Sequence, residues 1–469
     1  MSAIDEATLF APVWQLSDRI RQRKLSPVEL TEAYLARIER WGPKLNAVAY
    51  ATPELAREQA KQAETEIGRG KWRGPLHGIP YGAKDLFSTA GIPTEWGAGC
   101  CRGQVFDRDA TVVTRLRDAG AVLLGKLAMI EFAGGLGYRK ADASSTGPCR
   151  NPLDRTRWTG GSSSGSGAAV SGGLVAFALG TETWGSILCP SAFCGTTGVR
   201  PTYGRVSRAG AMVCSNTYDK VGPIARSARD CRLILSAIAG RDPDDPTSSA
   251  EPADFRGGRA IASLRAALVP LDFSKAREPE ARAAFDRAVT ELRGMGLAME
   301  EAKLPELPTA EVAGTIITAE ALSAFERFHK DGSIVKLHDP YARYQWEINE
   351  GLRGDDLVKA WRVRHEIQRR TTEFFADYDV IVTPNFLTTA PGVDEDINVA
   401  LDGYTDPAGA IGNTCGLPSI ALPSGLGSRG LPLGFQIMGP PFEEGTLLDL
   451  GEAFQKRTSF HTARPPMEA

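Results

Sequence analysis

The sequence predicts an α/β protein built as one large domain around a central sheet. Short apolar runs alternate with glycine and proline from about residue 74 to residue 230, and a helical pattern lies between two of these runs at residues 109–119. Strands that alternate with helices are typical of a sheet covered by helices. A strand-like pattern returns at residues 378–384 and 417–423. The simplest interpretation is one domain over residues 1–469, whose core is interrupted by a middle region of different character.

The first 73 residues predict a helical segment. Ser26 is a candidate N-cap, Pro27 suits the first helical position, and Glu29 completes a capping box. Residues 52–68 predict a second helix, polar and rich in alanine. Strands are expected at residues 78–85 and 121–126, within a core of residues 74–230.

The middle of the chain predicts helices rather than strands. Residues 240–257 are rich in Asp, Pro, Ser and Gly and predict a loop, whereas residues 278–295 and much of 305–370 carry helical patterns. We therefore expect residues 240–370 to be mostly helical. Residues 371–469 are expected to complete the sheet.

Composition excludes several classes of function. The 469 residues carry a formal net charge of −3, so no strong field attracts nucleic acid or an anionic membrane. No apolar run approaches the roughly 18–20 residues that a membrane helix needs. The N-terminus has acidic residues where a signal peptide has Lys or Arg. The eight cysteines form no C-x-x-C pair and the five histidines are scattered, so we expect a cytoplasmic protein without a metal site.

A glycine- and serine-rich tract spans residues 157–173. It leads directly into the apolar residues 174–179, so close packing of small residues explains it better than a flexible linker. A phosphate-binding loop is disfavoured, because neither G-K-[ST] nor the third glycine of G-x-G-x-x-G follows. Residues 161–165 match the nucleophile-elbow pattern G-x-S-x-G, but we do not expect residues 151–158 to form the strand that an elbow requires.

A third interpretation pairs a serine with a lysine. Ser186 ends a turn-like run after an apolar segment, and Lys84 lies in an apolar run bounded by glycine and proline. A lysine kept out of water has a lowered pKa and can act as a neutral base. It can then replace the histidine of a serine hydrolase, directly or through a second hydroxyl such as that of Ser162. Each residue alone also fits a plain role, Lys84 as a paired lysine at a strand end and Ser186 as a turn serine.

Together these stretches closely resemble the amidase signature family over nearly the whole chain, most weakly between about residues 240 and 370. The matching stretches are residues 74–80 leading to Lys84 and Asp85, 160–163 with their small-residue tail, 185–187, 190–195, 199–205 and the region around 416–418.

The resemblance implies a central, mixed and twisted β-sheet with helices on both faces, and a Ser–Ser–Lys triad that uses no cofactor. In this triad Ser186 is the nucleophile, Lys84 is the base, and Ser162 is the relay, joined to Gly161 by a cis peptide bond. The resemblance also places the triad in the core of residues 74–230 and the substrate beside residues 240–370. The implied oxyanion hole consists of the backbone N–H groups of Thr183, Trp184, Gly185 and Ser186.

The sequence departs from the family pattern near the nucleophile. Glu182 replaces an aspartate, Trp184 a glycine, Leu188 an arginine, and Ser164 a glycine. Loss of the arginine removes a positive charge, so we expect a substrate that is neutral near the scissile bond. Residues 132–138 match part of the family's substrate-side loop. The implied substrate contacts are Ala133, Gly134, Gly135, Tyr138 and Leu188.

The implied activity is hydrolysis of C–N bonds in neutral, hydrophobic or aryl amides through a seryl acyl-enzyme. Carbamates (urethanes) are the alternative substrates. The rival assignment is the glutaminase component of a tRNA-dependent amidotransferase complex, which works with a partner protein. For the first assignment we expect a small-molecule substrate, no nucleic-acid or membrane partner, and a monomer or homodimer.

Overall fold

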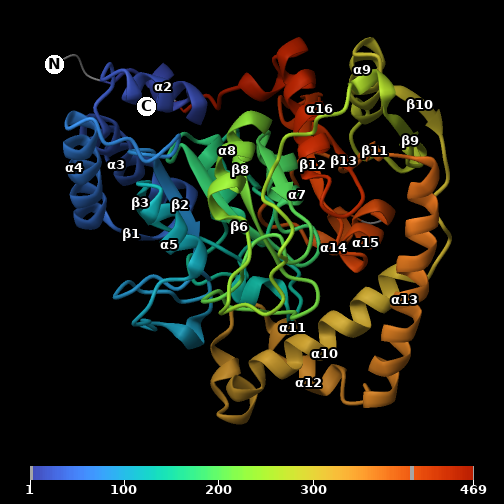
Figure 1. The fold of residues 1–469 in the computed structure, drawn as a ribbon. Coiled ribbons are helices and arrows are strands. Elements are labelled where there is room, and N and C mark those ends of the chain that lie inside the picture. The colour runs from blue at the N-terminus through green and yellow to red at the C-terminus, as the bar shows by residue number, and fades with distance from the viewer. Residues whose placement is uncertain (1–3, 402–405, 468–469) are drawn as a thin grey trace.

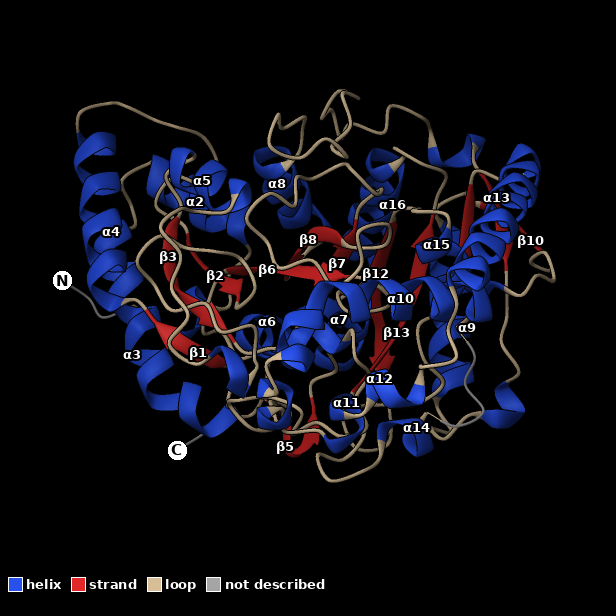
Figure 2. Ribbon diagram, turned by 90° about the horizontal axis from the view of Figure 1, so that it is seen from below, coloured by secondary structure: helices blue, strands red, loops and turns tan. Residues whose placement is uncertain are grey.

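A mixed sheet of 11 strands runs through the molecule, with helices on both of its faces (Figures 1 and 2). This computed structural model describes residues 4–401 and 406–467. The strand order is β1-β3-β2-β6-β8-β7-β12-β13-β11-β9-β10, and β4 and β5 form a separate two-stranded sheet. The predicted α/β class and single-domain architecture are confirmed.

The strands of the main sheet are β1 (Val48–Ala51), β2 (Pro80–Lys84), β3 (Val122–Leu127), β6 (Phe177–Glu182), β7 (Thr197–Arg200), β8 (Lys220–Ala225), β9 (Arg265–Leu268), β10 (Ala298–Glu301), β11 (Val380–Pro384), β12 (Ser419–Leu426) and β13 (Pro432–Met438). The small sheet contains β4 (Arg150–Asn151) and β5 (Asp154–Trp158).

The α-helices are α1 (Glu6–Leu9), α2 (Val13–Arg21), α3 (Pro27–Leu45), α4 (Pro53–Gly68), α5 (Thr111–Asp118), α6 (Ser164–Ser171), α7 (Leu188–Cys194), α8 (Ala228–Ile238), α9 (Ala281–Gly294), α10 (Thr309–Lys330), α11 (Pro340–Arg343), α12 (Gln345–Ile348), α13 (Gly354–Asp377), α14 (Ile397–Ala400), α15 (Pro407–Thr414) and α16 (Glu444–Arg457). Short 3₁₀ turns include η2 (Glu131–Gly134) and η6 (Phe460–Thr462).

Local sequence signals account for the start of α3. Ser26 Oγ accepts a hydrogen bond from the N–H of Glu29 at 3.1 Å, and Pro27 is the first helical residue. The helix ends where Asn46 adopts a left-handed conformation with φ of 49°. Both ends therefore follow ordinary capping chemistry.

Two segments that we expected to be helical, the N-terminal segment and the middle region, also contain β-strands. The N-terminal segment adds β1, which pairs antiparallel with β3 at the sheet edge. The middle region adds β9 and β10, which pair in parallel and end the sheet on its other side.

The prediction that residues 151–158 form no strand is wrong. Residues 154–158 are strand β5, which pairs antiparallel with β4. Its first residues are polar and partly exposed, so they lack the apolar character by which a buried strand is recognised. Because β5 lies outside the main sheet, it does not form the strand of a nucleophile elbow.

Small residues let α6 lie close to neighbouring backbone. Every residue of this helix is buried. A Cβ on Gly165 would lie 2.3 Å from the carbonyl oxygen of Ala47, and a Cβ on Gly167 would lie 3.0 Å from Cβ of Pro190. Larger side chains would force these segments apart, which explains the composition of the tract.

The sheet topology brings two strand ends together. β2 is hydrogen-bonded in parallel to β6, with Tyr81 opposite Phe177. The carboxyl ends of parallel strands meet at one edge of a sheet, so Lys84 at the end of β2 lies beside the end of β6. None of the described helices is long and apolar enough to cross a membrane.

Candidate active site

Lys84 is fully buried at the end of β2. Its Nζ lies 2.7 Å from Ser162 Oγ and 3.0 Å from Thr181 Oγ1, as hydrogen-bond geometry requires. Burial lowers the pKa of Lys84 to about 7, because the charged ammonium form loses its hydration. A large share of the amine is therefore neutral near pH 7.

Ser162 is held by the backbone on both sides. The peptide bond between Gly161 and Ser162 is cis, as the family resemblance implies. The carbonyl of Ser162 accepts a hydrogen bond from the N–H of Ile130 at 3.1 Å. A Cβ on Gly161 would lie 2.8 Å from the Trp158 ring and 2.9 Å from Ile130, so only glycine fits there.

Ser163, the central serine of the G-x-S-x-G match, is not free to react. Its Oγ donates to the carbonyl of Thr181 at 3.2 Å and accepts from the N–H of the same residue at 3.3 Å. The N–H of Ser163 donates to the carbonyl of Ser186 at 3.3 Å. This backbone contact places the segment of Ser162 directly beside the segment of Ser186.

Ser186 lies in a turn between β6 and α7. Gly185 before it has φ of +84°, a conformation that glycine adopts without strain. Among the described residues, the N–H groups of Trp184, Gly185 and Ser186 have no hydrogen-bond acceptor. Unpaired donors beside a serine hydroxyl are what an oxyanion hole requires.

A buried carboxylate holds the chain that follows Ser186. Glu182 Oε2 accepts the N–H groups of Ile187 and Leu188 at 2.9 and 3.0 Å, and Oε1 accepts from Arg200 Nη1 at 2.8 Å. Burial by itself raises the pKa of Glu182, but the Arg200 guanidinium holds it below its usual value. The glutamate that replaces the expected aspartate therefore stays ionised and ties the turn to the sheet.

A second carboxylate, Asp219, holds the same turn and was not predicted from the sequence. Asp219 Oδ1 accepts a hydrogen bond from Thr183 Oγ1 at 2.5 Å. Its Oδ2 accepts the N–H groups of Cys214 and Ser215 at 2.8 and 3.1 Å. The available signal was a charged pair, Asp219 and Lys220, immediately before the apolar residues of β8.

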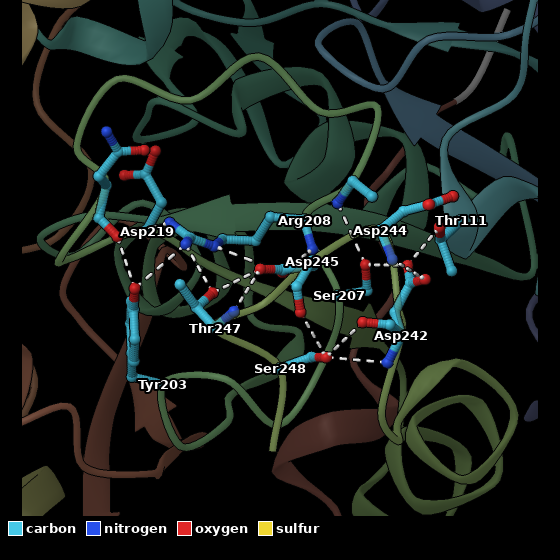
Figure 3. Close-up of polar contacts among 12 residues, drawn as sticks. Thr111, Tyr203, Ser207, Arg208, Asp219, Asp242, Asp244, Asp245, Thr247 and Ser248 are labelled. Atoms are coloured by element: carbon cyan, nitrogen blue, oxygen red, sulfur yellow. Dashed lines mark hydrogen bonds and ion pairs between the residues drawn. The ribbon is translucent and has the colours of Figure 1, made fainter. Parts of the chain in front are cut away.

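The segment that leads to Asp219 is fixed by a polar network, whose side chains point toward one another in Figure 3. Arg208 donates to the carbonyl of Asn216 at 2.8 Å and to Thr247 Oγ1 at 2.8 Å. Asp242 accepts from Thr111 Oγ1 at 2.6 Å and from Ser207 Oγ. The predicted loop at residues 240–257 therefore anchors the segment that carries Asp219.

The predicted substrate loop lies against α10. Ala133 has a positive φ of 56°. A Cβ on Gly134 would lie 2.7 Å from the Tyr138 ring, and a Cβ on Gly135 would lie 3.0 Å from Cβ of Cys214. The glycines thus let the loop fold against its own Tyr138 and pack on Cys214, the residue whose N–H is held by Asp219.

Apolar groups surround this loop. The rings of Phe132 and Phe325 stack with their centres 4.2 Å apart, and Phe328 lies 5.0 Å from Phe132. Leu188 is buried at the start of α7, whereas Trp184 is 36% exposed. The three phenylalanine rings are thus buried support for the loop, whereas Trp184 is a partly exposed aromatic side chain next to Ser186 in the turn.

The described part of the chain contains no candidate metal-binding site. Within residues 4–401 and 406–467, no three His, Cys, Asp or Glu side chains come together as metal ligands would. The structure thus brings Lys84, Ser162 and the backbone of Ser186 together, with Thr181 as an additional partner of Lys84.

Known proteins resemble this chain over nearly its whole length. The model of the Amidase family matches residues 29–448. A glutamyl-tRNA(Gln) amidotransferase subunit of Moorella thermoacetica is 37% identical, with 97% of this chain and 98% of the relative covered. AmiD of Mycobacterium tuberculosis, an amidase by name, is 37% identical over 97% of this chain and 95% of the relative. The solved structure of the native peptide amidase from Stenotrophomonas maltophilia is 30% identical, with a TM-score of 0.83 and 98% of each chain covered.

Proposed function

The chain belongs to the amidase signature family of hydrolases, and from this premise we propose that it cleaves C–N bonds of neutral amides through a seryl acyl-enzyme. The observation that carries the proposal is the buried amine of Lys84, which contacts two hydroxyl groups and no carboxylate among the described residues. An amine in this setting is a base rather than half of an ion pair.

The proposed reaction begins with proton transfer. Neutral Lys84 takes the proton of Ser162 while Ser162 takes that of Ser186, and Ser186 Oγ attacks the substrate carbonyl. The backbone N–H groups of residues 183–186 stabilise the negative oxygen that develops. The proton then returns to the leaving amine, and water hydrolyses the acyl-enzyme to release the acid.

We propose hydrophobic or aryl amides as the preferred substrates. Trp184, which is 36% exposed beside the unpaired backbone donors, presents an aromatic surface that favours an apolar substrate. Leu188, which is 5% exposed where the family pattern has an arginine, removes a charge that would hold an acidic substrate. Carbamates are the alternative, since a carbamoyl-enzyme follows the same chemistry and its hydrolysis product loses carbon dioxide.

The relative from Moorella thermoacetica supports a second candidate, the glutaminase component of a tRNA-dependent amidotransferase. That function requires a pocket for the charged ends of glutamine and a partner protein that receives the ammonia. The apolar Leu188, where the family pattern has an arginine, counts against it. Glutaminase activity and a copurifying partner protein would favour it.

A substrate panel separates these functions. Aryl amides, aryl carbamates, aryl esters and glutamine are incubated with the wild type and with Ser186→Ala, and release of amine, alcohol or ammonia is measured. The proposal expects aryl amides or carbamates to turn over with much higher kcat/KM than glutamine, and all of these activities to vanish in the variant. Glutamine as the preferred substrate would establish the second candidate, and full activity of Ser186→Ala would refute the site.

We also propose that the protein works in a reducing compartment such as the cytoplasm. Its eight cysteines are all free thiols. Proteins of oxidising compartments more often pair their cysteines.

A further inference from the structure

A cavity of about 570 Å³ lies between the first helices and the C-terminal segment. Its walls come from α1, α2, the start of α8, the end of α16 and η6. β8 runs antiparallel to β6, with Lys220 opposite Glu182, so Arg226 after the end of β8 lies at the sheet edge away from Ser186. The cavity is therefore separate from the candidate active site.

Positive charge dominates the cavity. Its two acidic side chains are already engaged: Asp5 accepts the N–H and the hydroxyl of Thr8 at 2.9 and 2.5 Å, and Glu452 pairs with Arg232 at 2.7 Å. The cationic side chains of its wall are Arg19, Arg226, Arg229, Lys456 and Arg464. An excess of cations around a concave surface attracts anions.

Arg226 is the buried member of this set, only 7% exposed. Its Nη2 donates to the carbonyl of Val170, while its Nε has no hydrogen-bond partner among the described residues. The buried carboxylate of Asp230 interacts electrostatically with this guanidinium from beyond salt-bridge distance. This partner offsets the cost of burying the Arg226 charge only in part, so a bound anion would stabilise the cavity further.

Three guanidinium groups converge on the Phe10 ring: that of Arg37, which pairs with Glu6 at 3.0 Å, and two from the cavity wall. The Cζ atoms of Arg226 and Arg464 lie 4.5 and 5.4 Å from the centre of the Phe10 ring. Arg229 lies 4.3 Å from the Trp14 ring. Because the positive charges repel one another, an anion between them would offset that repulsion.

Part of the remaining wall is apolar. Phe10, Ala11, Pro12 and Trp14 line the same cavity. A free inorganic ion would leave this surface exposed to water, whereas an organic anion would cover it. We propose that this cavity binds a small organic anion, with its carboxylate or phosphate between Arg226, Arg229 and Arg464 and its apolar body against Phe10 and Trp14.

Isothermal titration calorimetry with defined probes tests the proposal. The probes are 3-phenylpropionate, phenyl phosphate, inorganic phosphate and the neutral 3-phenylpropionamide, the last titrated into Ser186→Ala to prevent turnover. The test variant is Arg229→Gln with Arg464→Gln, two exposed positions at the cavity. The control is Lys61→Gln with Lys303→Gln, which removes the same charge from exposed positions elsewhere.

We expect the wild type to bind an aryl anion saturably. The dissociation constant should rise about tenfold or more in the test variant, because a hydrogen bond to a charged group contributes about 1.5–3 kcal/mol. It should be unchanged in the control. The tighter of the two aryl anions identifies the head group as carboxylate or phosphate. If the test variant bound the aryl anion as tightly as the wild type, the anion would bind in the active site rather than in this cavity, and the proposal would be wrong. Equal binding of the neutral amide, or inorganic phosphate binding as tightly as phenyl phosphate, would also overturn it.

Discussion

The Nζ atom of Lys84 lies 2.7 Å from Ser162 Oγ, although 78 positions separate the two residues in the chain. Both side chains are buried, and the second partner of the amine is another hydroxyl, that of Thr181. Burial lowers the pKa of this amine to about 7 and outweighs the more distant charges of Asp219 and Glu182, which favour the protonated form. The proposed mechanism depends on this arrangement.

The first prediction concerns pH. The active form of Lys84 is the neutral amine, which predominates above its pKa of about 7. We therefore expect kcat/KM for an aryl amide to rise about tenfold per pH unit below pH 7 and to level off above it. Burial lowers the pKa of Lys220 to about 7 as well, so Lys220→Met is the control and should retain the same pH limb. If kcat/KM levelled off only near pH 10, Lys84 would be protonated at pH 7, which would contradict the prediction.

The second prediction concerns the nucleophile. Ser186→Ala should lower kcat by about 10,000-fold or more, because no hydroxyl remains to form the acyl-enzyme. Mass spectrometry of wild-type enzyme quenched during turnover should show a mass increase equal to the acyl group, on the peptide that contains Ser186. Ser191→Ala is the control, since Ser191 Oγ donates to the carbonyl of Ile187, one turn earlier in the chain, at 2.8 Å. An acyl group on any other residue would refute the assignment.

The third prediction separates two adjacent serines. Ser162→Ala should lower kcat by about 100- to 10,000-fold, because the proton path from Ser186 to Lys84 is interrupted. Ser163→Ala should change kcat only severalfold, since the Ser163 hydroxyl bonds backbone atoms of Thr181. Steady-state kinetics on one aryl amide measures both variants. Equal losses in the two variants would indicate a structural role for the whole tract.

The fourth prediction concerns the buried pair of Glu182 and Arg200, in which both side chains are 0% exposed. Glu182→Gln leaves the guanidinium buried without a counter-charge, which should lower the free energy of unfolding by about 3–5 kcal/mol. Glu373→Gln breaks an exposed pair with Arg369 and should cost at most about 1 kcal/mol. Urea unfolding of the two variants provides the comparison, and similar losses would contradict the proposed role of Glu182.

The fifth prediction tests substrate polarity at position 188. Leu188→Arg places a charge at a position that is 5% exposed, so kcat/KM for neutral aryl amides should stay level or fall. Leu188→Met conserves volume and should change kcat/KM less than about threefold. Circular dichroism verifies that both variants fold. A strong gain on neutral amides in Leu188→Arg would show that the pocket favours a positive charge.

Local patterns predicted much of the fold. The cap at Ser26, the strands at β2, β3, β11 and β12, and the loop at residues 240–257 depend on short-range signals that the sequence displays directly. β5 was missed because its polar residues carry no such signal. β1 and β10 were missed because a short edge strand is defined by its partner more than by its own residues, and β9, between β11 and β10, was missed because its four residues are too few to show a strand pattern.

The sequence by itself identified Lys84, Ser162 and Ser186 as candidates, since their motifs are local and glycine-rich. The tertiary structure was needed to show that Lys84 is buried and bonded to two hydroxyls, that Asp219 holds Thr183, and that Arg226 lines a cavity between the first helices and the C-terminal segment. Burial and charge compensation depend on residues far apart in sequence, and no local pattern encodes their distances. For this reason the sequence indicated which residues could take part in the reaction, but it did not show which of their side chains are charged.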